Sequence, residues 1–169
     1  MPMLRGFLHQ RWVAPAALLG VVAALAIPMA FADSPHFIGT PTCTKSADFS
    51  LTCSGKASGL GNSPSAAFLT SSDVSGSLQC QNNGGNFPAP KQFDFGPLTG
   101  QTQSITPHNG QITFSPTIGP PPLPSAKDFC PNGKTWRLVV LSLTYDNVVL
   151  HIQQGGVDLL TWDFGNVDP

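Results

Sequence analysis

The clearest structural signal in this chain lies in residues 136–164, which read WRLVVLSLTYDNVVLHIQQGGVDLLTWDF. Residues 136–145 form a nearly continuous apolar run, a pattern typical of a central strand that is buried on both faces. Asp146-Asn147 and Gly155-Gly156 are pairs that favour tight turns, and each is followed by a further apolar segment. The C-terminal part of the chain therefore predicts a meander of three antiparallel strands.

Shorter segments upstream repeat the alternation of apolar and polar residues that marks a half-buried strand. The strands predicted in this way are centred on residues 49–54, 66–71, 74–81, 92–95 and 111–115. Ser72-Asp73 separates the second from the third, and Asn109-Gly110 forms a turn before the last. About seven to nine short strands predict an all-β fold, an immunoglobulin-like antiparallel β-sandwich stabilised by disulfides, with a β-barrel as the alternative.

The first 32 residues have the composition of an export signal. Arg5, His9 and Arg11 precede an uncharged apolar stretch over residues 12–31, and Ala30-Phe31-Ala32 is a small-x-small cleavage site. The stretch is also long enough for a membrane anchor, but Pro28 near its end and the cleavage site favour its removal. We therefore expect residues 1–32 to be a cleaved signal peptide and residues 33–169 to be a single secreted domain without a membrane span.

The composition of the expected mature chain is that of an exported β domain. Removing Arg5 and Arg11 from the eight basic residues leaves six against nine Asp, which gives a net charge of −3. This balance gives no reason to expect binding to nucleic acid or anionic lipid, which requires clustered cations. The chain also contains no Glu, so it lacks one of the strong helix formers.

Four cysteines lie in the expected mature chain, at Cys43, Cys53, Cys80 and Cys130. In an oxidising compartment an even number indicates two disulfides, and three pairings are possible. Cys43 and Cys53 are close enough in sequence to face each other across a hairpin, which leaves Cys80 to pair with Cys130. A zinc site is disfavoured because the spacings contain no C-x-x-C pair and no short Cys/His cluster.

The common catalytic and metal-binding patterns are missing from the sequence. No G-x-S-x-G nucleophile motif is present. The spacing of His36, His108 and His151 does not indicate a metal site, and His151 falls on the polar side of its strand. Asp163 and Asp168 lack the spacing of a calcium loop. We therefore assign no catalytic residue, no metal and no cofactor, although nine Asp leave open a carboxylate site assembled by the fold.

One loop is a candidate ligand-contacting surface. Residues 82–90 include Asn82, Asn83, Asn86 and Phe87, together with Gly and Pro residues that favour an exposed connection with fixed turns. The same composition fits a rigid turn without a ligand. The tryptophans of the mature chain fit core positions better than an exposed platform for sugars.

Four segments carry a resemblance to a known group of proteins. They are SGKASGLGN over residues 54–62, CQNNGGN over 80–86, NGQITF over 109–114, and Cys130-Pro131-Asn132 followed by Trp136. In order and spacing they resemble a family of small secreted bacterial β-sandwich proteins of unknown function, most familiar in actinobacteria. The resemblance implies that Cys80 pairs with Cys130 and that Cys43 pairs with Cys53, and it carries over no catalytic residue.

These observations favour a non-enzymatic extracellular binding or surface-interaction module, whose partner is a cell-wall polysaccharide or another extracellular protein. Two alternatives stay open. One is a small secreted hydrolase, which predicts several Asp in one cleft with raised pKa values. The other is a secreted inhibitor or toxin-like protein, which predicts a rigid exposed loop.

Overall fold

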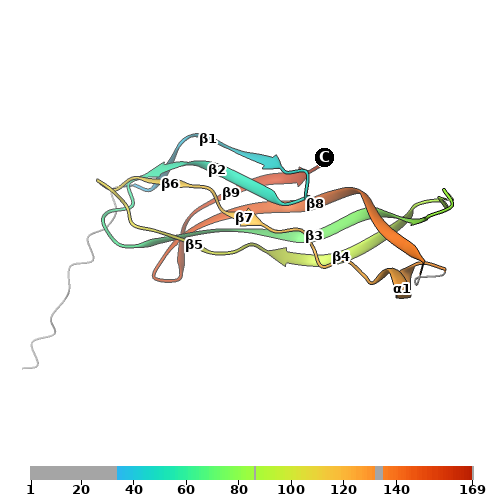
Figure 1. Ribbon diagram of the computed structural model, residues 1–169. Helices are drawn as coiled ribbons and strands as arrows, with labels where there is room; N and C mark the ends of the chain where they lie inside the picture. Colours follow the sequence, from blue (N-terminus) through green and yellow to red (C-terminus); the bar gives the residue numbers. More distant parts are fainter. Residues whose placement is uncertain (1–33, 86, 132–134, 169) are drawn as a thin grey trace, which may run out of the picture.

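The computed structural model describes residues 34–85, 87–131 and 135–168 of the chain. Within these residues the strands form two separate antiparallel sheets that pack against each other (Figure 1). The predicted β-sandwich is therefore confirmed, and the closed alternative is not formed by the described strands. The expected signal peptide, residues 1–32, lies outside the described residues.

The two sheets differ in size. The smaller has the order β1-β2-β6, with β7 also paired to β2, and the larger has the order β4-β3-β8-β9, with β5 also paired to β3. The strands of the smaller sheet are β1 (His36–Lys45), β2 (Leu51–Ser58), β6 (Ile112–Phe114) and β7 (Thr117–Ile118). Those of the larger sheet are β3 (Ser65–Asn82), β4 (Lys91–Thr99), β5 (Gln103–Ile105), β8 (Trp136–Gln154) and β9 (Val157–Val167). The described chain also has a short helix, α1 (Ala126–Phe129), and it contains no helix with the length and apolarity of a membrane span.

Burial follows the alternation that the sequence predicts. Leu51 and Cys53 on β2 are fully buried, and Val74, Leu78 and Cys80 on β3 all face inward. The inward side chains of the two sheets form one core. It consists of Leu51, Cys53, Ala57, Leu60, Ala67, Leu69, Val74, Ile112, Phe114, Ile118, Leu143, Tyr145, Val148, Leu150 and Ile152.

Two predicted turns are wrong. Ser72-Asp73 and Asp146-Asn147 do not end strands, because β3 and β8 continue through them as single strands of 18 and 19 residues. Asp73 lies opposite Asp146, so the irregular parts of the two strands coincide. The Ser71 hydroxyl donates to the carbonyls of Asp73 (2.7 Å) and Asp146 (2.8 Å). The Ser71 hydroxyl thus satisfies backbone carbonyls of both strands, whereas one carboxylate oxygen of Asp73 is buried without a hydrogen-bond partner among the described residues. We call this point the waist (residues 71–73 and 146–147).

Two other predicted turns are confirmed. Gly155-Gly156 and Asn109-Gly110 have positive φ at both positions, the conformation that a type I′ turn requires. Gly155-Gly156 joins β8 to β9, and Asn109-Gly110 lies between His108 and Gln111, which pair with each other. Because the chain does not turn at the waist, the predicted three-strand meander is a single hairpin of two long strands.

β3 and β8 are longer than any strand of the smaller sheet, so their far halves extend beyond it (Figure 1). Together with the first half of β4 they form a three-stranded extension that we call the arm (residues 76–82, 91–95 and 136–144). The predicted burial of residues 136–145 on both faces is therefore wrong. Leu141 in this segment is 47% exposed, because the smaller sheet does not reach it.

The inner face of the arm is covered by α1 instead of by a second sheet. The Phe129 ring of α1 packs edge-on against Phe93 of β4, with 5.8 Å between the ring centroids. The disulfide between Cys80 and Cys130 fastens the end of α1 to β3. This bridge therefore extends the apolar interior past the limit of the smaller sheet.

Candidate functional site

Two shallow depressions lie along the side of the sandwich where β5 of the larger sheet meets β6 and β7 of the smaller sheet. Their volumes are about 300 and 290 Å³. The first is lined by Lys56, Ile105, Thr106, His108, Gln111, Ile112 and Thr113. The second is lined by Gln101, Thr102, Gln103, Ser115, Pro116 and Thr117. We refer to the two depressions together as the furrow.

Hydrogen bonds between the two sheets fix the floor of the furrow. The Gln103 side-chain oxygen accepts from the Ser115 N–H (2.8 Å), and the Gln101 N–H donates to the Thr117 carbonyl (3.2 Å). Gly100 permits this close approach, because a Cβ at that position would lie 2.5 Å from the Thr117 carbonyl oxygen. The furrow is therefore held in shape before any ligand arrives.

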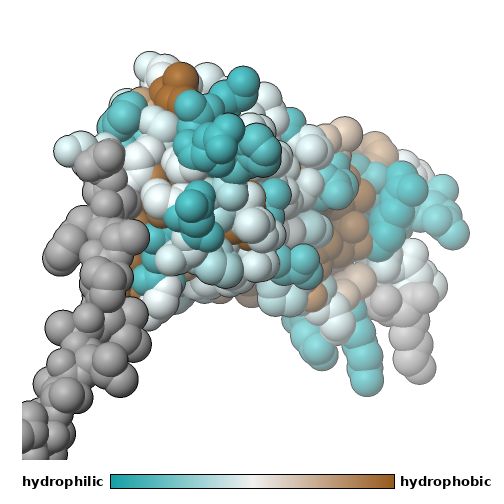
Figure 2. Space-filling model, turned by 90° about the vertical axis from the view of Figure 1, so that its left-hand side faces the viewer, coloured by the Kyte–Doolittle hydropathy of each residue, from teal (hydrophilic) through white to brown (hydrophobic). Residues whose placement is uncertain are grey.

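The furrow presents neutral hydrogen-bonding groups. The side chains of Gln101, Thr106, Gln111 and Thr113 line it and make no hydrogen bond to another described residue. Amides and hydroxyls can both donate and accept hydrogen bonds. No carboxylate lines the furrow, and Lys56 is the one permanently charged residue in its lining. Figure 2 looks at the end of the molecule where β5 and β6 lie, and the residues there are mostly hydrophilic or neutral.

The furrow was not predicted from the sequence, because it forms where β5 of the larger sheet lies beside β6 and β7 of the smaller sheet, and no local pattern shows that the two sheets meet there. Lys56 of β2 lies beside Thr113 of β6. One signal was available in the sequence. Residues 95–126, 32 consecutive positions, contain no Lys, Arg or Asp. This uncharged segment supplies all of the furrow lining except Lys56.

The predicted ligand-contacting loop lies elsewhere, at the tip of the arm (Figure 1). Asn82 ends β3 and its side-chain oxygen accepts from the Gly84 N–H (3.0 Å), while Asn83 is exposed. Phe87 is 55% exposed, and Asn86 lies outside the described residues. The loop and the furrow are at opposite ends of the molecule, so they do not form one binding surface. Ligand contact by the loop stays a prediction.

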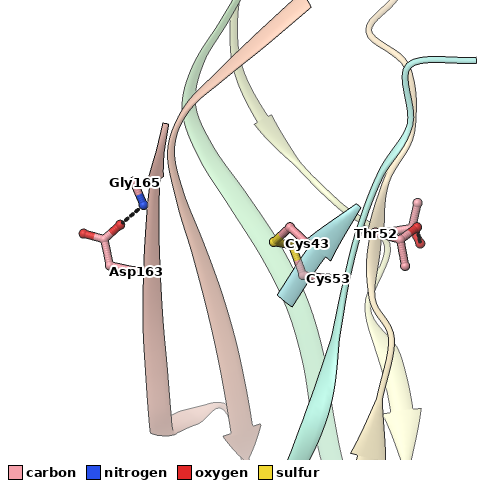
Figure 3. The surroundings of a disulfide bond; sticks show 6 residues. Cys43, Thr52, Cys53, Asp163 and Gly165 are labelled. Carbon is pink, nitrogen blue, oxygen red and sulfur yellow. Dashed lines mark hydrogen bonds between the residues drawn. A yellow bond between two sulfur atoms is a disulfide. The ribbon is translucent and has the colours of Figure 1, made fainter. Parts of the chain in front are cut away.

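Both disulfides have the expected pairing. Cys80 bonds to Cys130, and Cys43 bonds to Cys53. The second bridge joins directly opposed residues of β1 and β2, and Thr52 projects away from it (Figure 3). Cys53 is fully buried, and no cysteine of the described chain is free. None of the four is therefore available as a metal ligand or a nucleophile.

His151 lies on the outer face of the larger sheet between Thr70 and Asp158. The Thr70 hydroxyl oxygen is 3.1 Å from Nε2 of the imidazole, and an Asp158 carboxylate oxygen is 3.1 Å from Nδ1. The ring stacks on Phe68 with 4.8 Å between centroids, and its side chain is 20% exposed. Burial raises the pKa of Asp158, but hydrogen bonds from Gln153 and His151 and the charge of His151 outweigh it and lower that pKa.

The order of hydroxyl, imidazole and carboxylate is that of a catalytic triad, but its surroundings are not. Thr70 lies in the interior of the sheet, where β3 is paired with β4 on one side and β8 on the other. The backbone beside Thr70 is therefore hydrogen-bonded to the neighbouring strands, and its N–H groups are not free to stabilise an oxyanion. We interpret the three side chains as a polar network that orders the outer face. The described residues contain no group of three His, Cys or Asp suited to a metal.

One pair of carboxyl groups has a property that the hydrolase alternative predicts. A hydrogen bond with Asp94 raises the pKa of Asp73, and burial and the charges of Asp94 and Asp146 raise it further. A nearby carboxylate raises the pKa of a carboxyl group in this way because it disfavours the charged form. Neither depression of the furrow is lined by these residues, so neither depression supplies the pair with the substrate cleft that the alternative also requires.

No protein-family model matches this chain, and no curated protein sequence is significantly similar to it. The resemblance to small secreted bacterial proteins therefore stays a prediction.

Proposed function

We propose that this protein is a non-enzymatic extracellular binding module and that its furrow binds a neutral polysaccharide, such as one of a cell wall. The observation that carries the proposal is the lining of the furrow, in which amide and hydroxyl groups surround a fixed floor. Sugar hydroxyls donate and accept hydrogen bonds, so they are matched by side chains that do both. An anionic polymer would need clustered cations, and the lining has only Lys56.

The shape of the furrow supports a polymer rather than a single sugar. It follows the chain from Gln111 to Thr117, a length on the order of 20 Å for extended backbone. Both depressions are open to solvent, so neighbouring sugars of one polymer could occupy them.

Two disulfides support the extracellular setting of the proposal, because such bonds persist in oxidising compartments. Export by a signal peptide over residues 1–32 and an immunoglobulin-like arrangement of the sandwich belong to the same proposal.

The test is a pulldown of the mature chain, residues 33–169 with both disulfides intact, on insoluble neutral polysaccharides and on cell-wall fractions. We expect saturable retention on at least one of them. Gln111→Ala combined with Thr113→Ala removes two unpartnered groups of the lining. Each neutral hydrogen bond contributes about 1 kcal/mol, so the loss of two should weaken binding roughly 30-fold.

A matched control removes the same residue types from outside the furrow. Gln92 on β4 and Thr161 on β9 are both exposed, and Gln92→Ala combined with Thr161→Ala should leave binding unchanged. Retention on no polysaccharide, or an equal loss in the two double variants, would contradict the proposed site. If the mature chain is retained only by a protein of the culture fluid, the partner is a protein and the proposed polysaccharide is wrong.

A further inference from the structure

The first half of β8 is a free sheet edge. β9 pairs with β8 only from Tyr145 to Gln154, whereas β3 pairs with β8 along its whole length. Residues 136–144 therefore have β3 on one side and no described strand on the other, as the arm in Figure 1 shows. The Lys45 ammonium donates to the Leu143 carbonyl (2.7 Å) and covers the inner end of this edge. On the side away from β3, the part from Trp136 to Ser142 makes no backbone hydrogen bond to a described residue.

The other long edge strands carry features that block the addition of a strand. Natural sheets protect their edges with charges, prolines and bulges. β1 has a bulge next to Pro41, and β4 has a bulge between Asp94 and Pro97. β9 has three register shifts and carries Asp158 and Asp163. Each of these edges is therefore unsuited to continue its sheet into another molecule.

The free edge of β8 has few of these features. Its sequence, WRLVVLS, contains no proline, no glycine and no acidic residue. Its single charge, Arg137, is directed across the sheet to β3, where the guanidinium donates twice to the Gln81 side-chain oxygen (3.2 and 2.9 Å). One bulge lies at Leu141, and that leucine is 47% exposed.

We infer that two copies of this chain pair antiparallel through residues 136–142 of β8, so that their larger sheets join across a twofold axis. A twofold contact requires a surface that is complementary to itself, and an apolar strand with one redirected charge meets this requirement. If the axis passes near Val140, the two Arg137 residues lie about 20 Å apart along the strands, beyond the range of strong repulsion. A second copy of the chain has the same free edge on its own β8, so it can supply the strand that pairs with the first copy. No other protein is needed.

The inference is tested by sedimentation velocity of the mature chain over a wide range of concentrations. We expect the mass to rise from that of one chain to that of two and then to stay constant. Leu141→Lys places a charge on each side of the paired edge, and it should weaken dimerisation at least 100-fold. Leu123→Lys is the matched control, because Leu123 is 49% exposed but lies in the connection before α1, and it should dimerise as the unchanged protein does.

Hydrogen exchange on the unchanged protein gives a second readout that does not depend on a variant folding. Amides of residues 136–142 should become more protected as the concentration rises, while those of β9 should not change. A monomer at every concentration, a mass that grows past two chains, or equal behaviour of the two lysine variants would overturn the inference. Concentration-dependent protection confined to another edge would also overturn it.

Discussion

Tyr145 allows a direct test of how the two sheets are held together. It is the single tyrosine of the chain, it is 0% exposed, and it lies on β8 of the larger sheet. Its hydroxyl donates to the carbonyl of Phe49 (2.6 Å), which is in the turn between β1 and β2 of the smaller sheet. Burial, and then the charge of Asp48, raise the pKa of Tyr145 to about 12.

The raised pKa predicts a loss of stability at high pH. An unfolded tyrosine ionises near pH 10, so the folded and unfolded states bind this proton equally below that value. As the pH rises from about 10 to about 12, the unfolded state loses the proton first and is favoured. A difference of two pH units corresponds to at most about 2.7 kcal/mol.

The assay compares the unchanged protein with Tyr145→Phe by urea unfolding on both sides of this pH window. At neutral pH the variant should be less stable by about 1–3 kcal/mol, because the Phe49 carbonyl loses its donor. Between about pH 10 and 12 its stability should change less than that of the unchanged protein. Burial lowers the pKa of Lys45, but this lysine is present in both proteins, so their difference isolates the phenol.

Phenolate absorbance measures the same pKa directly, since the chain has one tyrosine. The reasoning would be refuted if the folded phenol titrated near pH 10, or if Tyr145→Phe lost stability over this window as steeply as the unchanged protein.

Two further predictions concern stability. Replacing Cys80 and Cys130 by Ala opens a loop of 50 residues and should cost about 4 kcal/mol, whereas opening the 10-residue loop of the β1–β2 bridge should cost about 2.7 kcal/mol. Equal losses in chemical denaturation would contradict the loop-entropy reasoning. Gly76→Ala should cost at least about 1–3 kcal/mol, because its Cβ would lie 2.6 Å from the Ser142 carbonyl oxygen. Gly119→Ala, where a Cβ meets nothing within 4 Å, should be close to neutral, and a similar loss there would rule out crowding as the cause.

Alternation along the chain predicted the fold class because burial on one face of a strand is a local property. The same reasoning failed at the waist. Ser72-Asp73 and Asp146-Asn147 are typical turn residues, and nothing local shows that each will meet the other. Inside the sheet they lie opposite each other, and the Asn147 amide donates to the Ser72 hydroxyl (2.9 Å). Polar pairs that would end isolated strands are therefore accommodated by a matching irregularity in the partner strand.

The burial pattern of both strands shows this irregularity as a change in the spacing of inward-facing residues. On β3, Ser71 is buried and the next inward residue is Val74, three positions later, instead of two. On β8 the same step separates Tyr145 from Val148. A three-residue step that occurs in both strands can be recognised in the sequence only when the two strands are known to be neighbours. For this reason four short strands were predicted in place of two long ones.

The candidate site was less predictable than the fold. The loop with Asn82 and Phe87 was singled out by composition, but composition does not show where a loop lies relative to the rest of the surface. The furrow exists because β5 ends up beside β6, and Gln103 then meets Ser115 across the gap between the sheets. A contact of this kind depends on the packing of two sheets, which no local pattern describes.

The furrow and the free edge lie at opposite ends of β3, and this separation has a consequence for binding. β5 pairs with Ser65–Ala67 at the start of β3, whereas Val140 of the free edge pairs with Leu78 near its end. These positions are about 40 Å apart along the strand, so a twofold pair of chains would hold its two furrows about 80 Å apart. Two such furrows on one repetitive polymer surface would bind with higher avidity than one. Leu141→Lys should then weaken retention on the insoluble polysaccharide while leaving the affinity for a short soluble oligosaccharide unchanged. An equal loss in both would show that Leu141 acts on the furrow itself and not through pairing.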